Sequence, residues 1–289
     1  MSSTTTTRRW QGITLFSLVV GYAGYYVCRS NLSVATPLLL EAFGSQGIDK
    51  EMIGFISSVG VAFYALGKLI NGTLADFLGG RRMFIFGMLG SIAATVTFGF
   101  GAGVAVFLGA WSVNRLMQSM GWPGLVKVAS HWFSHHSYGR VMGFLSLSFL
   151  FGDAAARFLL GRFIDVGFGW EAVFFFSAAI LGGIALMNAF TLKSTPDEIG
   201  LEPTAVNPDN LFGDEGGESR PDTIGDLLGP LLRSPEVWVV MFMSAGMTLI
   251  RQSFTFWTPT FLVEVAGMSK GSAAQYSLLY PLVGGFSVI

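Results

Sequence analysis

The sequence predicts an all-α membrane protein with two related helical bundles, the second of them incomplete. Hydrophobic residues make up 52% of the chain and charged residues only 12%, a balance far too apolar for a soluble globular domain. Long apolar runs follow one another along the whole chain, and a pattern in the first run recurs in the seventh. The composition indicates the class of protein, and the recurrence indicates the two bundles.

Each apolar run is expected to form one membrane-spanning helix, because roughly 20 helical residues cross the hydrocarbon core of a bilayer. In chain order the expected spans are 11–42, 52–76, 83–101, 104–130, 140–164, 170–192 and 233–263, with part of an eighth from 272 to the last residue. Six spans therefore precede the one long polar stretch that interrupts the pattern.

That polar stretch divides the chain. Residues 1–193 are expected to form a six-helix bundle, and residues 230–289 the incomplete start of a second bundle. Residues 194–229 are rich in Pro, Gly, Asp and Glu, a composition typical of a solvated linker. We expect this linker to be cytoplasmic.

Charged loops predict how the bundle is oriented. Arg8 and Arg9 precede the first span and Arg81 and Arg82 follow the second, whereas the loop 41–51 is net acidic. Because Lys and Arg collect in cytoplasmic loops, we expect a cytoplasmic N-terminus. The formal net charge of −1 gives no reason to expect nucleic acid as a partner.

Arg29 is the only formal charge between residues 12 and 40, and we expect it near the middle of the membrane. An arginine at this depth costs at least about 2.5 to 3.5 kcal/mol on insertion scales, so it must find water or an anion. On a helix, Tyr22, Tyr25 and Tyr26 are expected to share its face. We favour a polar, wet face over an interhelical ion pair or a side chain that snorkels to the surface.

The seventh span repeats the first. Pro37 follows Arg29 by eight residues, and Pro259 follows Arg251 by eight residues. Leu-Val-Glu at 262–264 matches Leu-Leu-Glu at 39–41. In the same way, Gly-Met-Ser-Lys at 267–270 matches Gly-Ile-Asp-Lys at 47–50. Such a repeat indicates a transporter with its site between two bundles at mid-membrane. Its register also predicts that the chain is a fragment, ending inside the second helix of the second bundle.

The segment from Gly72 to Arg82 contains a glycine, three residues, Asp76, and then glycines before a basic pair. It resembles the loop motif of the major facilitator superfamily, although Phe77 stands where a basic residue is usual. Asp76 ends its helix where it can meet a helix N-terminus or a basic group. The resemblance implies that Asp76, Arg81 and Arg82 act in gating.

Four further segments resemble the organophosphate:phosphate antiporters, the family of glycerol-3-phosphate, hexose-phosphate and glucose-6-phosphate transporters. They are residues 21–31, 120–123 and 194–201, and Arg251 with 257–260. The resemblance implies a major-facilitator fold and exchange of a phosphorylated small metabolite for inorganic phosphate by alternating access. It implies residence in the lipid bilayer of a bacterial inner (plasma) membrane, with no enzyme activity, no cofactor and no metal.

The resemblance also implies roles for single residues. The family's paired phosphate-binding arginines correspond to Arg29 and Arg251, its pore lysine to Lys68, and its helix-one tyrosines to Tyr22 and Tyr26. Two arginines suit a phosphate monoester, because a guanidinium stays charged and offers planar, bidentate donors. From the residues alone, Lys68 either adds positive charge to the site or snorkels toward the cytoplasmic end.

Other polar residues in the spans allow two interpretations. Asp153 and Arg157 lie four residues apart, and we favour an internal neutralising pair over a proton relay through Asp153. Arg115 is a candidate for gating or packing, and Ser148 stands where glycerol-phosphate transporters have a histidine. The three histidines are interpreted as interfacial residues and not as a metal site; they are His131, His135 and His136.

A second function remains open at this point. Some relatives in the resembled family sense extracellular sugar phosphate and signal through a partner histidine kinase. A sensor needs the same anion site as a transporter, so the residues named above do not separate the two.

Overall fold

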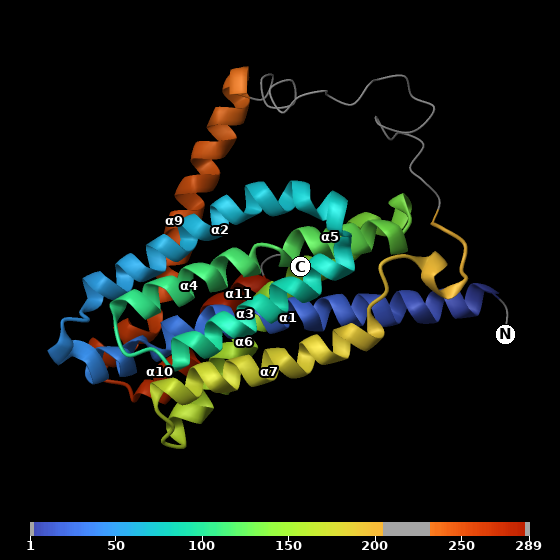
Figure 1. The fold of residues 1–289 in the computed structure, drawn as a ribbon. Helices are drawn as coiled ribbons and strands as arrows, with labels where there is room; N and C mark the ends of the chain where they lie inside the picture. The colour runs from blue at the N-terminus through green and yellow to red at the C-terminus, as the bar shows by residue number, and fades with distance from the viewer. Residues whose placement is uncertain (1–2, 205–231, 287–289) are drawn as a thin grey trace.

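The computed structural model describes residues 3–204 and 232–286, apart from the side chains of residues 3, 4, 73 and 76. In this part of the chain the expected bundle of spans is present (Figure 1). Its helices are α1 (Ser3–Phe43), α2 (Lys50–Leu78), α3 (Gly80–Gly99), α4 (Val104–Gln118), α5 (Gly121–Trp132), α6 (His135–Asp165), α7 (Trp170–Thr191), α9 (Pro235–Glu264), α10 (Lys270–Tyr276) and α11 (Leu279–Phe286), with short 3₁₀ turns η1 (Gly44–Gln46) and η2 (Pro196–Ile199).

Six of the described helices are long and apolar enough to cross a membrane, namely α1, α2, α3, α6, α7 and α9. The expected fourth span, 104–130, is not one helix but two, α4 and α5. Pro123 explains the break, because its ring collides with the carbonyl four residues earlier, at Ser119. The chain there makes a tight turn instead, in which the Met120 amide donates to the Met117 carbonyl at 3.2 Å. The expected eighth span is likewise divided, into α10 and α11.

Close helix contacts depend on small residues. A Cβ atom built on Gly80 of α3 would lie 2.7 Å from the carbonyl of Gly124 in α5, and one on Gly124 would lie 2.8 Å from the Gly80 carbonyl. Gly152 of α6 meets Ala23 of α1 in the same way, at 2.6 Å from its Cα. Lipid gives helices no hydrophobic reason to associate, so such close approach supplies the packing contacts.

Two clusters of buried side chains lie inside the bundle, one toward each end. Near the end that carries Glu41, Phe98 stacks on Phe174 with ring centroids 4.2 Å apart. Near the other end, Tyr25, Phe84 and Trp132 pack together. Between these clusters the helices of the bundle enclose the residues described in the next section.

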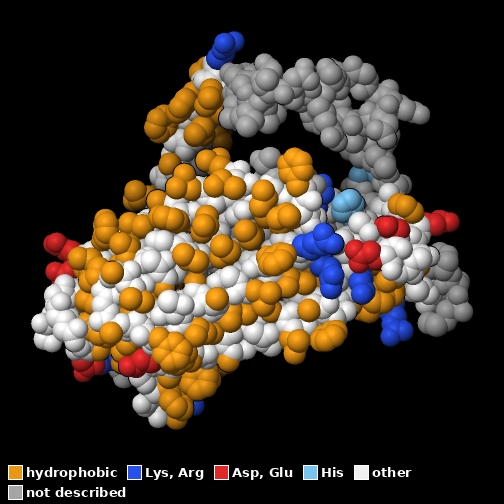
Figure 2. All heavy atoms as spheres, in the orientation of Figure 1, with side chains coloured by type: hydrophobic (Ala, Val, Ile, Leu, Met, Phe, Trp, Pro, Cys, Tyr) orange, Lys and Arg blue, Asp and Glu red, His pale blue; other side chains and the backbone are white. Residues whose placement is uncertain are grey.

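The outer surface is largely apolar (Figure 2). Hydrophobic side chains cover the middle of the face shown, while charged side chains gather toward its two ends. Phe16, Phe86, Leu186 and Phe190 are at least 60% exposed. A face of this kind is expected where helices meet lipid chains.

The second bundle begins with α9, which packs against α1 and α10. Its N-terminal half extends away from the other helices (Figure 1), and side chains there are exposed, among them Phe242 and Met247, each 71% exposed. Its C-terminal half meets α1 where the Ser33 hydroxyl donates to the Phe256 carbonyl at 2.6 Å. The two bundles therefore meet near the end that carries Glu41.

Candidate functional site

Three cationic side chains from three helices surround the ring of Tyr64 on α2. The guanidinium carbon of Arg29 lies 4.3 Å from the ring centroid, that of Arg115 5.0 Å and the Lys68 ammonium nitrogen 5.2 Å. A cation over an aromatic ring is attracted by roughly 0.5 to 2 kcal/mol, more when water is excluded. We call Tyr64, Arg29, Arg115 and Lys68 the cation cluster.

The packing of α2 on α4 explains why Arg115 reaches this ring. Gly60 and Gly67 flank Tyr64 on one face of α2, at four residues before it and three after. A Cβ atom on Gly60 would lie 3.0 Å from the Cγ of Arg115, and one on Gly67 would lie 2.9 Å from Leu116. Side chains at these two positions would hold α4 away, so the glycines allow the contact.

The charges of the cluster have no acidic partner. Among the described residues, the ion pairs join other groups, and no carboxylate lies within 4.0 Å of Arg29, Lys68 or Arg115. Arg29 donates one hydrogen bond, to the Tyr26 hydroxyl at 2.8 Å, and its Nε is buried without a partner. The Nε of Arg115 is likewise buried without a partner. Uncompensated charges at this depth are costly, so such a cluster indicates an anion site.

The predicted second arginine, Arg251, lies on α9 and is exposed. Its positive charge is near enough to act on the phenol of Tyr26. One helical turn later, the Thr255 carbonyl accepts hydrogen bonds from α1 and α6, which directs this part of α9 toward the first bundle. Arg251 therefore lies one helical turn from the contact between α9 and the first bundle.

A cavity of about 650 Å³ lies between α2 and α9. Serine, threonine and glutamine side chains lie among apolar ones along its wall, and a mostly apolar wall with a few polar groups is usual for small-molecule sites. Thr248, which stands where the resembled family usually has a tyrosine, is one of the polar side chains. The lining residues are Gly54, Ser57, Ser58, Val61, Ser244, Ala245, Thr248, Leu249, Gln252, Ser253, Phe256 and Trp257.

The tyrosines of α1 do not all share one face. Tyr26 contacts Arg29. The ring of Tyr22 meets that of Tyr26 edge-on, with centroids 5.8 Å apart, and lies tilted 5.4 Å from Trp122, and Tyr22 is only 6% exposed. The prediction for Tyr25 is wrong, because its hydroxyl donates to the Phe84 carbonyl at 2.5 Å inside the bundle. Helical spacing puts Tyr25 at the edge of the face, about 100° from Tyr26. The ring turns inward at that edge because Gly87 and Gly121 leave room for it.

The three predicted gating residues lie at the turn between α2 and α3. Arg81 donates to the Ala189 carbonyl of α7 at 2.7 Å, which ties this turn to the end of α7 within one bundle. Arg82 is exposed. The side chain of Asp76 lies outside what the structure describes, so its role stays a prediction.

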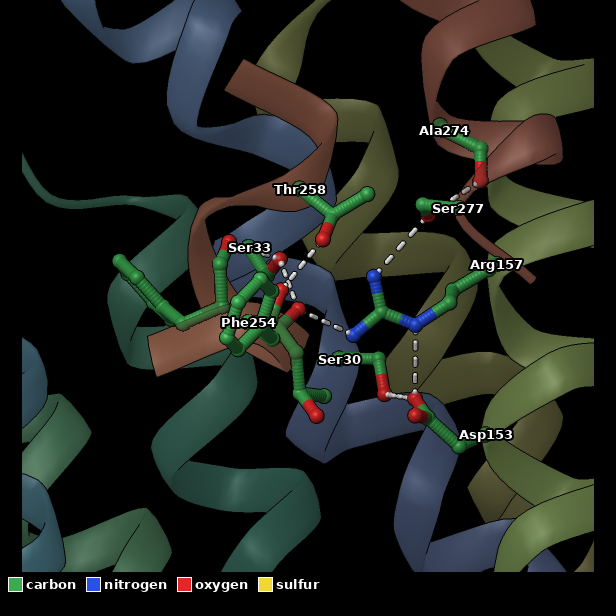
Figure 3. A network of polar contacts seen from close by, with 10 residues as sticks. Ser30, Ser33, Asp153, Arg157, Phe254, Thr258, Ala274 and Ser277 are labelled. Carbon is green, nitrogen blue, oxygen red and sulfur yellow. Dashed lines mark hydrogen bonds and ion pairs between the residues drawn. The ribbon is translucent and has the colours of Figure 1, made fainter. Parts of the chain in front are cut away.

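Asp153 and Arg157 form the predicted neutralising pair, with 3.1 Å between Oδ1 and Nε. The pair also joins the bundles, which the sequence did not indicate (Figure 3). Arg157 donates to the Thr255 carbonyl of α9 at 2.8 Å and to the Ser277 hydroxyl at 3.0 Å, and the Ser30 hydroxyl of α1 donates to Asp153. Both charged side chains are buried.

Two residues of the site were missed or left unassigned by sequence reasoning. Tyr64 was not assigned to the site, and Arg115 was named only as a candidate for gating or packing. The available signal for Arg115 was its position as a second unpaired arginine inside a span. Ser148, buried, donates only to the Leu145 carbonyl at 2.5 Å.

Known proteins resemble this chain over nearly its whole length. The glycerol-3-phosphate transporter of Bacillus subtilis is 26% identical over 275 residues, which are 92% of this chain and 61% of the relative. Sugar phosphate exchanger 3 of Gallus gallus is 29% identical over 81% of this chain and 51% of the relative. The membrane sensor protein UhpC of Salmonella typhimurium is 21% identical over 96% of this chain and 62% of the relative.

Among solved structures, a bacterial homologue of the human lysosomal transporter Spinster, in an inward-facing and unoccupied conformation, superposes with a TM-score of 0.73. It is 17% identical, and the match covers 95% of this chain and 60% of that one. This chain thus spans about three fifths of the length of such relatives. The first two relatives above are named as a transporter and an exchanger, in agreement with the expectation that the protein is not an enzyme. Because the Major Facilitator Superfamily profile matches residues 18–289 and these relatives agree with the resemblance to the organophosphate:phosphate antiporters, the chain belongs to the Major Facilitator Superfamily.

Proposed function

We propose that the full-length protein exchanges a phosphorylated small metabolite for inorganic phosphate across a membrane by alternating access. The observation that carries this proposal is the cation cluster, in which Arg29 and Arg115 lie inside the bundle and have no carboxylate partner within the part of the chain that the structure describes. A phosphate monoester carries about −1.5 to −2 charges and three acceptor oxygens near pH 7. It therefore supplies the negative charge and the acceptors that the protein does not.

The magnitude of the repulsion supports an anion in this place. Both guanidinium carbons lie within 5.0 Å of one ring centroid, so they are at most about 9 Å apart. Two unit charges at that separation repel by roughly 2 kcal/mol at an effective dielectric constant of 20. A bound dianion converts this repulsion into attraction at both guanidiniums. We assign Arg29 and Arg251 to the phosphate, with Tyr22, Tyr26 and Lys68 around it.

The same charges explain exchange in place of one-way transport. When the site is empty, movement of Arg251 toward Arg29 brings like charges together and opposes closure of the cavity. When phosphate or a phosphate ester is bound, that movement becomes favourable and the bundles can rock. Return of the protein to the other side therefore needs an anion on each pass.

Two ion pairs, which we call the paired bridges, join the two bundles at the end that carries Glu41. Lys50 pairs with Glu264 at 2.6 Å, and Lys270 pairs with Glu41. Glu41 and Glu264 occupy equivalent positions in the repeat, and so do Lys50 and Lys270, so each bundle offers one acid and one base to the other. By the charge of the loops, this end is extracellular and the N-terminus is cytoplasmic.

The names of two relatives support the substrate class, since one refers to glycerol-3-phosphate and the other to sugar phosphate. One relative is named as a membrane sensor, which keeps a receptor for extracellular sugar phosphate, with a histidine kinase as partner, as the second candidate. A bacterial inner membrane is the residence that fits both.

The test is counterflow into proteoliposomes that contain the full-length protein. Vesicles loaded with inorganic phosphate should take up labelled organic phosphate, and empty vesicles should not. Arg29→Lys should abolish uptake, because lysine lacks the planar fork, while Arg9→Lys at an exposed position serves as the matched control. Equal uptake into empty vesicles would refute exchange, and saturable binding without any uptake would favour the sensor.

A further inference from the structure

Arg115 stands apart from the two arginines assigned to phosphate. It lies on α4 and is only 4% exposed. Its guanidinium stacks near Tyr64 at 5.0 Å and near Trp111 at 5.9 Å. Among the described residues no carboxylate pairs with it and no hydrogen bond to it is present, although it is charged and inside the bundle.

The terminal nitrogens of Arg115 remain available to a ligand. Its Nε is one of the buried polar atoms without a partner, whereas its two terminal nitrogens are not among those buried atoms. The small exposed fraction of this side chain therefore includes the end of the guanidinium. The guanidinium of Arg29 has a similar environment, because its Nε is buried without a partner and one terminal nitrogen donates a hydrogen bond to the Tyr26 hydroxyl.

We propose that Arg115 binds a second anionic group on the substrate, a carboxylate, so that the preferred metabolite is a small phosphorylated acid. This proposal rests on the exchange function proposed above. Arg29 and Arg251 balance the two charges of one phosphate dianion, which leaves Arg115 as the guanidinium of the cation cluster that has no anion assigned to it. A carboxylate carries one negative charge, and its two oxygens can accept two parallel N–H hydrogen bonds from a guanidinium.

The spacing sets the size of that substrate. The two guanidinium carbons that share the Tyr64 ring are at most about 9 Å apart, and each is expected to stand about one hydrogen bond from its anion. The phosphate and the carboxylate are therefore separated by only a few carbon atoms. Larger sugar phosphates without a carboxylate would leave Arg115 without its anion.

Two probes of nearly equal shape test the proposal. 3-Phosphoglycerate and glycerol 3-phosphate differ mainly in whether a carboxylate or a hydroxymethyl group stands opposite the phosphate. Each is measured as an inhibitor of inorganic phosphate exchange by the full-length protein in proteoliposomes. The wild-type protein should bind 3-phosphoglycerate at least about 10-fold more tightly, the factor expected for one hydrogen-bonded charge.

Variants separate a binding role from a structural one. Arg115→Gln should weaken the binding of 3-phosphoglycerate roughly 10- to 100-fold more than it weakens the binding of glycerol 3-phosphate or inorganic phosphate, because those two anions have no carboxylate. Arg115→Lys should restore part of the preference. Arg162→Gln, which changes an arginine whose side chain is 61% exposed, is the matched control.

The possible results are distinct. A wild-type protein that exchanges phosphate but shows no preference between the probes overturns this proposal and leaves the exchange function standing. If Arg115→Gln weakens the binding of all three anions equally, the proposal is also overturned, because that result assigns Arg115 to packing or to the phosphate. Absence of any phosphate exchange by the wild-type protein refutes the proposed function itself.

Discussion

Reversing one charge of the Glu41–Lys270 bridge should open the protein at the end where the paired bridges join the two bundles. The bridge joins the end of α1 to the start of α10, and its counterpart joins Lys50 to Glu264. Glu41→Lys places two ammonium groups where an acid and a base now meet. Lys270→Glu does the same with two carboxylates.

The expected magnitude follows from exposure. The side chains are 30% and 69% exposed in the Lys270–Glu41 bridge and 54% and 42% exposed in the other, so each bridge contributes only about 0.2 to 1 kcal/mol. Reversal removes one attraction and adds a similar repulsion, roughly 0.4 to 2 kcal/mol in all. The ratio of closed to open protein should fall about 2- to 30-fold, and the effect should shrink as added salt screens it.

Spin labels at Ser45 and Val265, both exposed at this end, report the opening as a longer inter-label distance. Both single variants should increase the fraction at the longer distance, and the double variant Glu41→Lys with Lys270→Glu should return it to the wild-type value. The reasoning is refuted if the single variants keep the wild-type distribution or if the double variant adds their effects.

Two further predictions concern the interior. Arg157→Leu should lower the free energy of unfolding by about 3 to 5 kcal/mol, since Asp153 is left buried without its partner. Thermal unfolding in detergent measures this loss, and a second change, Asp153→Leu, should recover much of it. An unchanged Tm in the single variant would contradict the prediction. Tyr64→Phe should keep phosphate affinity within about 3-fold of the wild-type value, because the ring that the cations contact remains. Tyr64→Leu, which removes the ring, should weaken phosphate affinity roughly 2- to 30-fold. Calorimetric titration compares the two variants, and equal affinities would exclude a role for the ring.

Several features of this protein are encoded locally and were open to prediction. Apolar length predicts the spans, because the bilayer needs a fixed number of helical residues. The spacing of Asp153 and Arg157 predicts their ion pair, since residues four apart on a helix are neighbours whatever surrounds them. The repeat around Arg29 and Arg251 predicts that two arginines hold equivalent positions in two bundles.

What the tertiary structure decided is which neighbour each helical face meets. Periodicity describes rotation about one helix axis and says nothing of the adjacent helix, so it could not bring Arg115 of α4 beside Arg29 of α1. That meeting depends on Gly60 and Gly67, whose lack of a side chain lets α4 reach the ring of Tyr64.

Tyr25 also shows that helical spacing does not determine which neighbouring helix a side chain meets. Its spacing placed it with Tyr26, but the slot left by Gly87 and Gly121 draws its hydroxyl to the Phe84 carbonyl. The sequence by itself determined most of the spans, the buried charge of α1 and the duplication, whereas the breaks inside the expected fourth and eighth spans appear only in the structure. The packing of one helix on another decided which charges share an anion site and which are neutralised, because contact between distant segments depends on shape at both surfaces and not on the pattern of either one.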